Sequence, residues 1–210
     1  MPNPTFQIKL HQLGKRYRFD WIFRQLDYQF EAGSSYAILG ANGSGKSTLL
    51  KILAGHLTPT KGKIEFYQNK QPVRTDDIYR TVSYAAPYIE LIEEFTLKES
   101  LRFHQRFQPL LADLTTADLL NMLQFDKAKN KEIKFFSSGM KQRLKLVLAC
   151  CSATPLLLLD EPTTNLDEQG MEWYLDLIKR FTAERLVIVA SNVPIDYQFC
   201  TQQLHIRDFK

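Results

Sequence analysis

Three glycines are packed into the nine residues 40–48, which read GANGSGKST. The residues just before them, SSYAILG at 34–40, form a short apolar run that suits a strand buried on both faces. Leu49, Ile52 and Leu53, just after them, recur at helical spacing. Because glycine allows backbone conformations that other residues avoid, the segment predicts a tight loop between a buried strand and a helix. This unit is typical of α/β folds.

The same nine residues match the phosphate-loop pattern GxxxxGK[ST]. In such a loop the backbone N–H groups turn inward toward phosphate oxygens, and the following helix adds its dipole. Lys46 is predicted to reach the β and γ phosphates, and the Ser47 hydroxyl to bind Mg²⁺. An ordinary glycine-rich turn is the alternative, and the flanking strand and helix disfavour it. The predicted nucleoside triphosphate site comprises Gly40, Asn42, Gly43, Ser44, Gly45, Lys46, Ser47 and Thr48.

A second constraint lies at 156–161, where four leucines run directly into Asp160 and Glu161. A buried strand that ends in two adjacent carboxylates is unfavourable unless something compensates the charge. Beside a phosphate loop, Mg²⁺ and a triphosphate supply that compensation. We therefore predict that Asp160 binds Mg²⁺ and that Glu161 polarises the water that attacks the γ-phosphate. With Lys46 and Ser47, these residues form the minimum set for hydrolysis of a nucleoside triphosphate.

Hydrophobic periodicity separates the chain into strand-rich and helix-rich parts. Alternating patterns at 6–13 and 21–30 and a short run at 64–67 predict strands in the first third. Residues 96–154 carry mostly helical patterns, and apolar runs at 156–159 and 186–190 again predict buried strands. Buried strands that alternate with helices indicate an α/β fold with a largely parallel sheet, in which the helical block is an insertion.

The segment FSSGMKQR at 136–143 opens one of the predicted helices, and on its own it indicates only that Ser137 or Ser138 is an N-cap. However, it resembles the LSGGQ signature of ABC ATPases in its LSGGMKQR form. LDEPTTNLD at 159–167 resembles the second phosphate motif and the D-loop of that family. This resemblance implies a P-loop NTPase with a RecA-like core, an N-terminal antiparallel β-subdomain and an inserted α-helical subdomain at about 88–152. Residues 1–210 then form a single nucleotide-binding domain.

The resemblance also implies how the site is completed. ABC nucleotide-binding domains form head-to-tail dimers, in which the signature of one subunit contacts the nucleotide held by the other. Asp167 is at the D-loop position, which crosses the dimer, although it also reads as an N-cap. Tyr17 is at the position of an aromatic residue that stacks on adenine, with Trp21 or Phe19 as alternatives. The implied signature residues are Ser137, Ser138, Gly139 and Met140.

Two positions depart from the family pattern. Pro87 stands where the family has the glutamine of the Q-loop, and proline offers neither a polar side chain nor a backbone N–H. Asn192 stands where a histidine usually hydrogen-bonds the γ-phosphate, and its amide can donate to phosphate but cannot take a proton. We expect ATP hydrolysis with an altered rate or coupling. The alternative is a site that binds ATP and dimerises but hydrolyses it very slowly.

The implied function is the ATP-binding subunit of an ABC transporter, which hydrolyses Mg-ATP as a homodimer or heterodimer to drive integral membrane permease subunits. The exposed helical block and the loop at 84–94 form the candidate docking surface for these subunits, with a solvated, partly packed loop as the equal alternative. A non-transport ABC scaffold and a small-molecule kinase are further alternatives. The kinase leaves the FSSGMKQR segment unexplained.

Composition limits the other partners and the location. The chain has 210 residues, of which 44% are hydrophobic and 24% charged, as in soluble globular proteins. Its net charge is only +4 and no run of five basic residues occurs, so we expect no nucleic-acid partner. Residues 1–10 do not resemble a secretory signal, and no stretch approaches the roughly 18 apolar residues of a membrane span. We expect a cytoplasmic protein, peripheral to the membrane through its partner.

Overall fold

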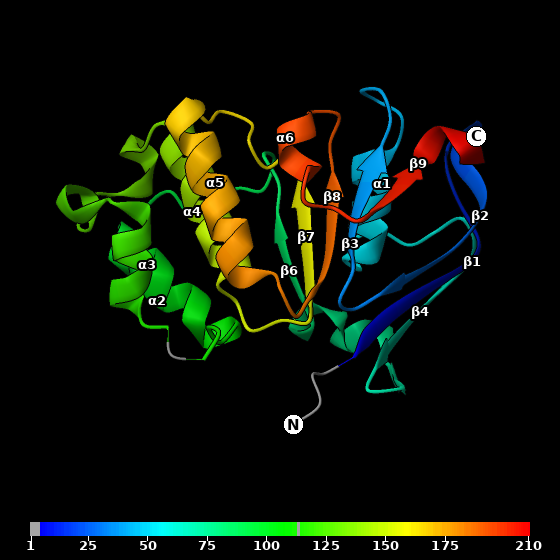
Figure 1. Ribbon diagram of the computed structural model, residues 1–210, viewed down its shortest axis with the longest axis horizontal. Coiled ribbons are helices and arrows are strands. Elements are labelled where there is room, and N and C mark those ends of the chain that lie inside the picture. The colour runs from blue at the N-terminus through cyan, green and yellow to red at the C-terminus, as the bar shows by residue number, and fades with distance from the viewer. Residues whose placement is uncertain (1–4, 113) are drawn as a thin grey trace.

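The computed structural model describes residues 5–112 and 114–210. Two stretches lie outside the described residues: 1–4 and 113. The first is part of the segment in which we expect no secretory signal, and the second is inside the expected helical insertion. Within the described part, the chain forms one antiparallel and one parallel β-sheet with helices beside them (Figure 1). The predicted mixed α/β fold is therefore confirmed.

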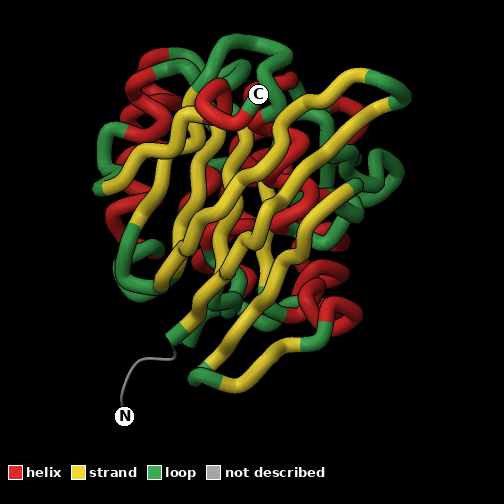
Figure 2. The backbone as a smooth tube through the Cα atoms, turned by 90° about the vertical axis from the view of Figure 1, so that its right-hand side faces the viewer, coloured by secondary structure: helices red, strands yellow, loops and turns green. Residues whose placement is uncertain are grey.

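The antiparallel sheet is built mainly from the first third of the chain, as the alternating patterns predict. Its strand order is β2-β1-β4-β5, and Figure 2 shows its long strands. Two 12-residue strands form a hairpin, and the aromatic and aliphatic side chains on its inner face are buried. The strands are β1 (Phe6–Tyr17), β2 (Asp20–Glu31), β4 (Lys61–Gln68) and β5 (Gln71–Val73).

The second sheet has the order β6-β7-β8-β3-β9, and all its pairings are parallel. Its first four strands in this order consist largely of buried residues, which explains why the sequence shows continuous apolar runs here instead of alternation. The strands are β3 (Ser35–Leu39), β6 (Val82–Ala85), β7 (Leu156–Asp160), β8 (Leu186–Ala190) and β9 (Gln202–His205).

The four leucines of β7 divide between two hydrophobic cores. Leu156 and Leu158 pack in the core that lies between the two sheets and includes α1 (Lys46–Leu53). Leu157 and Leu159 pack on the other face of the parallel sheet, against α4 (Ser138–Cys150) and α5 (Glu168–Phe181). The strand is central in its sheet and covered on both faces, so each of its apolar side chains is removed from water.

Between β6 and β7 the chain forms the helices α2 (Leu97–Phe107), α3 (Thr116–Leu123) and α4, within the range expected for the inserted subdomain. Thr96 and Glu99 form a capping box at the start of α2, and Thr115 and Asp118 form another at α3. The remaining helical segments are α6 (Pro194–Tyr197) and the 3₁₀ turns η1 (Thr75–Arg80), η2 (Asp126–Ala128), η3 (Ile133–Phe135) and η4 (Ile206–Phe209).

We expect Leu158→Ala to destabilise the fold strongly, because Leu158 is fully buried in the core between the sheets. Truncation of a buried leucine to alanine costs about 2–5 kcal/mol in the free energy of unfolding. Urea unfolding followed by circular dichroism measures this loss. Ile92→Ala is the matched control because Ile92 is 41% exposed, and equal losses for both variants would contradict the packing described here.

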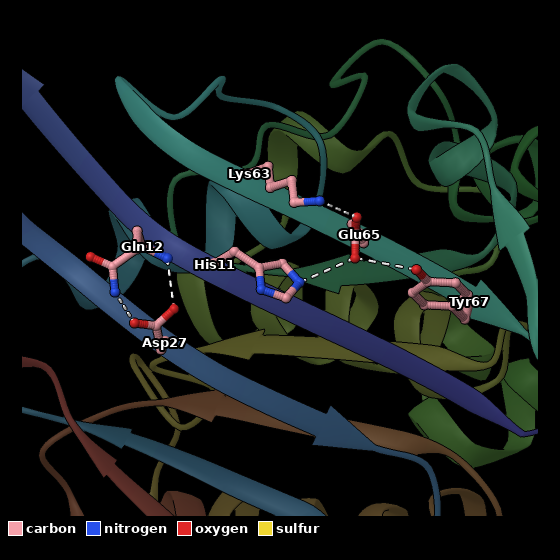
Figure 3. Close-up of polar contacts among 6 residues, drawn as sticks. All are labelled: His11, Gln12, Asp27, Lys63, Glu65 and Tyr67. Carbon is pink, nitrogen blue, oxygen red and sulfur yellow. Dashed lines mark hydrogen bonds and ion pairs between the residues drawn. The ribbon is translucent and has the colours of Figure 1, made fainter.

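A polar cluster lies on the outer face of the antiparallel sheet (Figure 3). The Lys63 ammonium donates to Glu65 Oε1 at 2.7 Å, and His11 Nε2 lies 3.1 Å from Glu65 Oε2, to which the Tyr67 hydroxyl also donates. Lys63 and these neighbours lower the pKa of Glu65 to about 2. A glutamate in the unfolded chain has a pKa of about 4.3, so the unfolded state binds more protons between these values.

The contribution of Glu65 to stability is therefore complete above about pH 4.3 and is lost as the pH falls toward 2. We expect Lys63→Ala to raise the pKa of Glu65, because it removes the largest cause of the shift. An NMR titration of the Glu65 carboxyl carbon measures the midpoint in both proteins. An unchanged midpoint in the variant would show that Lys63 does not hold this carboxylate.

Candidate nucleotide-binding site

The phosphate loop joins the end of β3 to the start of α1, as predicted. Gly40, Gly43 and Gly45 have φ values of +156°, +74° and +111°, which residues with a Cβ rarely adopt. At Gly45 a Cβ would also lie 2.4 Å from the Ile22 side chain. The loop therefore needs glycine for both its conformation and its close contact with β2, and the N-terminal turn of α1 follows directly.

Lys46 is only 4% exposed, and its ammonium is held by the loop itself. Nζ donates to the carbonyl oxygens of Gly40 at 2.7 Å and Ala41 at 3.3 Å. These bonds keep the charge inside the curl of the loop. A phosphate group that enters the curl meets a cation already positioned at its centre.

A hollow of about 170 Å³ opens over this loop. Glu161, which follows β7, and Ile22 of β2 both line the hollow. The other lining residues are Asn42, Gly43, Ser44, Gly45, Lys46, Ser47 and Thr48. The fold thus brings together the predicted phosphate-binding residues and the predicted water-activating carboxylate, although more than 110 residues of sequence separate them.

Asp160 and Glu161 occupy different environments. Asp160 is 1% exposed, and its Oδ1 atom has no hydrogen-bond partner among the described residues. Glu161 is partly exposed in the hollow, with a left-handed φ of +43° and its N–H donating to the Ala190 carbonyl at 2.9 Å. A left-handed non-glycine residue is strained, and such strain is common where side chains must be aimed at a site.

Ser47 and Asp160 fit a divalent cation. A buried carboxylate with a free oxygen needs a positive partner, and the hydroxyl and carboxylate oxygens are the ligand types that Mg²⁺ prefers. The Asp160 carboxylate accepts from the hydroxyl of Tyr88, which donates to Oδ2 at 2.6 Å. Burial of Tyr88 and its hydrogen bond to Asp160 raise the pKa of its hydroxyl.

Tyr88 was not predicted from the sequence. It immediately follows Pro87, and β6 pairs with β7 so that Ala85 lies beside Leu159. The turn after β6 is therefore adjacent to Asp160. The sequence signal that could have pointed to Tyr88 is its place directly after Pro87, where the family has the Q-loop glutamine. The Pro87 carbonyl itself accepts a hydrogen bond from Lys145 Nζ at 2.7 Å.

Asn192 follows β8 and is exposed near the phosphate loop, where its Nδ2 donates to Asn42 Oδ1 at 3.2 Å. The preceding residue is fixed, since the Ser191 hydroxyl donates to the buried Asp196 carboxylate at 2.5 Å. The Asn192 side chain is thus linked to one residue of the loop. Its predicted contact with the γ-phosphate remains a prediction.

The signature segment lies away from this hollow. Ser137 is the N-cap of α4, where its hydroxyl accepts from the Met140 N–H, and Ser138 is the first helical residue. Both serines are exposed. The helix packs on the face of the parallel sheet opposite α1, as Figure 1 shows. A Cβ on Gly139 would lie 2.9 Å from the Asn165 carbonyl, so this segment is packed tightly on the loop before α5.

Asp167 is the N-cap of α5, and its Oδ1 accepts from the Gly170 N–H at 2.8 Å. The alternative N-cap reading therefore describes its local role. The residue is also exposed, and Arg143 of the signature helix lies 4.0 Å from the same oxygen. The signature and the D-loop position are thus neighbours on one surface.

The register of the β1–β2 hairpin separates the three aromatic candidates for adenine stacking. Arg16 pairs with Trp21 and Tyr17 with Asp20, so Tyr17 and Trp21 point to opposite faces. Trp21 lies under the cations of Arg16 and Lys61. Ile22, the neighbour of Trp21, faces the phosphate loop, and Tyr17 shares its side of the hairpin.

Phe19 lies at the hairpin turn and is 90% exposed. Tyr17 is 46% exposed, and the ammonium of Lys15 lies over its ring. Of the two strand residues, Tyr17 and not Trp21 is the one on the phosphate-loop side of the hairpin, and it is exposed. Its contact with adenine stays a prediction.

A family model described as ABC transporter matches residues 23–164, which include the phosphate loop, the signature helix and the acidic strand end. The chain belongs to this family. It is 30% identical over 207 residues to the lantibiotic transport ATP-binding protein SrtF of Streptococcus pyogenes, covering 96% of this chain and 84% of SrtF. It is 31% identical over 191 residues to the Nod factor export ATP-binding protein I of Burkholderia lata, covering 90% of this chain and 63% of that protein.

Solved ABC cassettes share the fold. A putative ABC transporter ATP-binding protein from Pyrococcus furiosus superposes with a TM-score of 0.80 at 19% identity, over 97% of this chain and 99% of that one. The dimeric structure of MJ0796, a bacterial ABC transporter cassette, gives 0.79 at 22% identity, over 95% and 94%. Within the described part of this ABC family member, none of the helices combines the length and apolar character needed to cross a membrane.

Proposed function

We propose that residues 1–210 form a single ABC nucleotide-binding domain that hydrolyses Mg-ATP to drive separate membrane permease subunits. The observation that carries this proposal is the hollow in which the phosphate loop faces Glu161 while Asp160 is buried beside it. Membership of the ABC transporter family supports ATP as the substrate. The names of SrtF and of the Nod factor export protein support a role in transport.

Residues in and around the hollow have distinct roles in this reaction. The N–H groups of the loop and the Lys46 ammonium bind the β and γ phosphates, and Glu161 orients and polarises the attacking water. Ser47 and Asp160 would hold Mg²⁺, which neutralises charge on the phosphates when bound. Asn192 donates its amide toward the γ-phosphate. Tyr17 stacks on adenine from the exposed end of the hairpin.

A second copy of the chain completes the site in this proposal. The exposed N-terminus of α4 presents the N–H groups of Ser138 and Gly139, together with the hydroxyls of Ser137 and Ser138, all suited to an anion. Because α4 lies on the opposite face of the sheet from α1, this helix end has no triphosphate within its own chain. A head-to-tail homodimer, or a heterodimer with a related domain, supplies one. Asp167, beside the signature, then lies at the crossing between the copies.

This chain has a groove in which a membrane subunit could dock. A cavity of about 490 Å³ lies between the turn after β6 and helix α2, and aromatic and aliphatic side chains line most of it. Phe103 and Phe107 are 41% and 69% exposed at its edge. The loop expected at 84–94 forms one wall, although Tyr84 and Ala85 belong to β6 rather than to the loop. We propose that a segment of the permease occupies this groove on the cytoplasmic side of the membrane.

Steady-state hydrolysis of Mg-ATP by the purified chain tests the enzymatic part of the proposal. We expect turnover by the wild type, and faster turnover by Asn192→His, because imidazole reaches further than the asparagine amide. Asn121→His, a change of the same type in α3, is the control variant. ATP binding without turnover in the wild type would favour the slow-hydrolysis alternative instead.

A further inference from the structure

The hydroxyl of Tyr88 contacts one of the two predicted Mg²⁺ ligands: it donates to Asp160 Oδ2 at 2.6 Å. Asp160 is almost fully buried, so its two oxygens have fixed surroundings. Its Oδ2 atom accepts from the hydroxyls of Tyr88 at 2.6 Å and Tyr84 at 3.5 Å, and its Oδ1 atom has no partner among the described residues.

The Tyr88 side chain is itself held in place from several directions. The Lys51 ammonium lies over its ring, 4.1 Å from the centroid. Lys51 and Ser47 are four residues apart on α1, and therefore lie on the same face of that helix. The Tyr84 hydroxyl contacts the Tyr88 hydroxyl from β6. Contacts from both α1 and β6 thus direct this hydroxyl toward Asp160.

The turn that carries Tyr88 is also fixed. Lys145 of α4 donates to the carbonyl oxygen of Pro87 at 2.7 Å, and the Ile89 N–H donates to the Ala86 carbonyl at 3.2 Å. Pro87 adds a restricted φ to the turn. Tyr88 is 45% exposed even though its hydroxyl is directed inward. Packing in the core is therefore not the only role of its ring.

We propose that Tyr88 is a positioning residue of the metal site: its hydroxyl holds Asp160 Oδ2 and leaves Oδ1 free to bind the divalent cation. This inference rests on the proposed function, because it requires a site for Mg-ATP. Hydrogen bonds from neighbouring groups orient metal-binding carboxylates, and their removal typically lowers metal affinity or activity about 10- to 100-fold. Pro87 has no polar side chain that could hold Asp160, and Tyr88, the next residue, provides the hydroxyl that does.

The test compares ATP affinity with Mg²⁺ and with EDTA, by equilibrium titration of the wild type and Tyr88→Phe. The ratio of the two dissociation constants measures how much the cation strengthens binding. We expect Tyr88→Phe to reduce this ratio about 10- to 100-fold while the dissociation constant in EDTA stays unchanged. Tyr79→Phe is the matched control, because Tyr79 is 59% exposed and its hydroxyl contacts Arg80.

A general loss of structure would change both dissociation constants, whereas loss of carboxylate positioning changes only the one with Mg²⁺. A second variant, Asp160→Asn, tests whether Tyr88 acts through the Asp160 carboxylate. In the Asp160→Asn background, adding Tyr88→Phe is expected to lower the ratio by less than twofold. A ratio in Tyr88→Phe equal to that of the wild type would overturn the inference, as would a wild type that binds ATP equally with and without Mg²⁺. A wild type that binds no ATP in either buffer would instead overturn the proposed function, and the inference with it.

Discussion

Glu161→Gln is expected to lower the rate of ATP hydrolysis by about 10²- to 10⁴-fold, the range for loss of a positioned general base. Glutamine has nearly the same shape but cannot accept the proton of the attacking water. The residue lines the hollow beside Lys46 and Ser47, so the change affects the reaction centre directly. Phosphate release under steady-state conditions measures the rate.

The same variant is expected to bind ATP with an affinity close to that of the wild type, because none of the loop contacts is removed. Bound ATP then persists, and we expect the two-chain form to accumulate in size-exclusion chromatography with Mg-ATP. Glu184→Gln, on the exposed loop before β8, is the matched control and should retain full turnover. Undiminished turnover in Glu161→Gln would show that another group activates the water.

Lys46→Ala is expected to weaken ATP binding about 10- to 150-fold. A hydrogen bond to a charged group contributes about 1.5–3 kcal/mol, and each 1.4 kcal/mol corresponds to a tenfold change in affinity. Lys46 is buried at the centre of the loop, where no other ammonium lines the hollow among the described residues. Equilibrium titration with ATP measures the loss.

Lys179→Ala, an exposed position on α5, is the matched control for the loss of one positive charge. It is expected to leave ATP affinity unchanged. Circular dichroism checks that Lys46→Ala remains folded, since this change also removes the bonds to the Gly40 and Ala41 carbonyls. Equal ATP affinity in the two variants would contradict the assignment of Lys46 to the phosphates.

The sequence predicts most of this fold because its strongest signals are local. The glycines of the phosphate loop and the apolar run before Asp160 each depend on residues close in sequence. Periodicity likewise predicts strands in the regions of β1 and β2 and the buried strands of the parallel sheet. The division of the β7 leucines between two cores follows from strand alternation once the helices are placed.

The contacts of Tyr88 could not be predicted in the same way. They depend on the register of β6 against β7, on a helix face that carries Ser47 and Lys51, and on the turn held by Lys145. Apart from the contact with Tyr84, which is close in sequence, the contacts of Tyr88 join segments that are far apart in the chain. The choice between Tyr17 and Trp21 was open for a similar reason, because it depends on which face of the hairpin each ring occupies.

Equilibrium binding of ATP to the purified wild-type chain in the presence of Mg²⁺ tests the central claim most directly. Calorimetric titration gives both affinity and stoichiometry without requiring turnover or a membrane partner. We predict saturable binding of one ATP per chain, abolished or strongly weakened in Lys46→Ala and unchanged in Lys179→Ala. A folded wild-type protein that bound no ATP would contradict the assignment of the hollow at residues 42–48 as a nucleotide site.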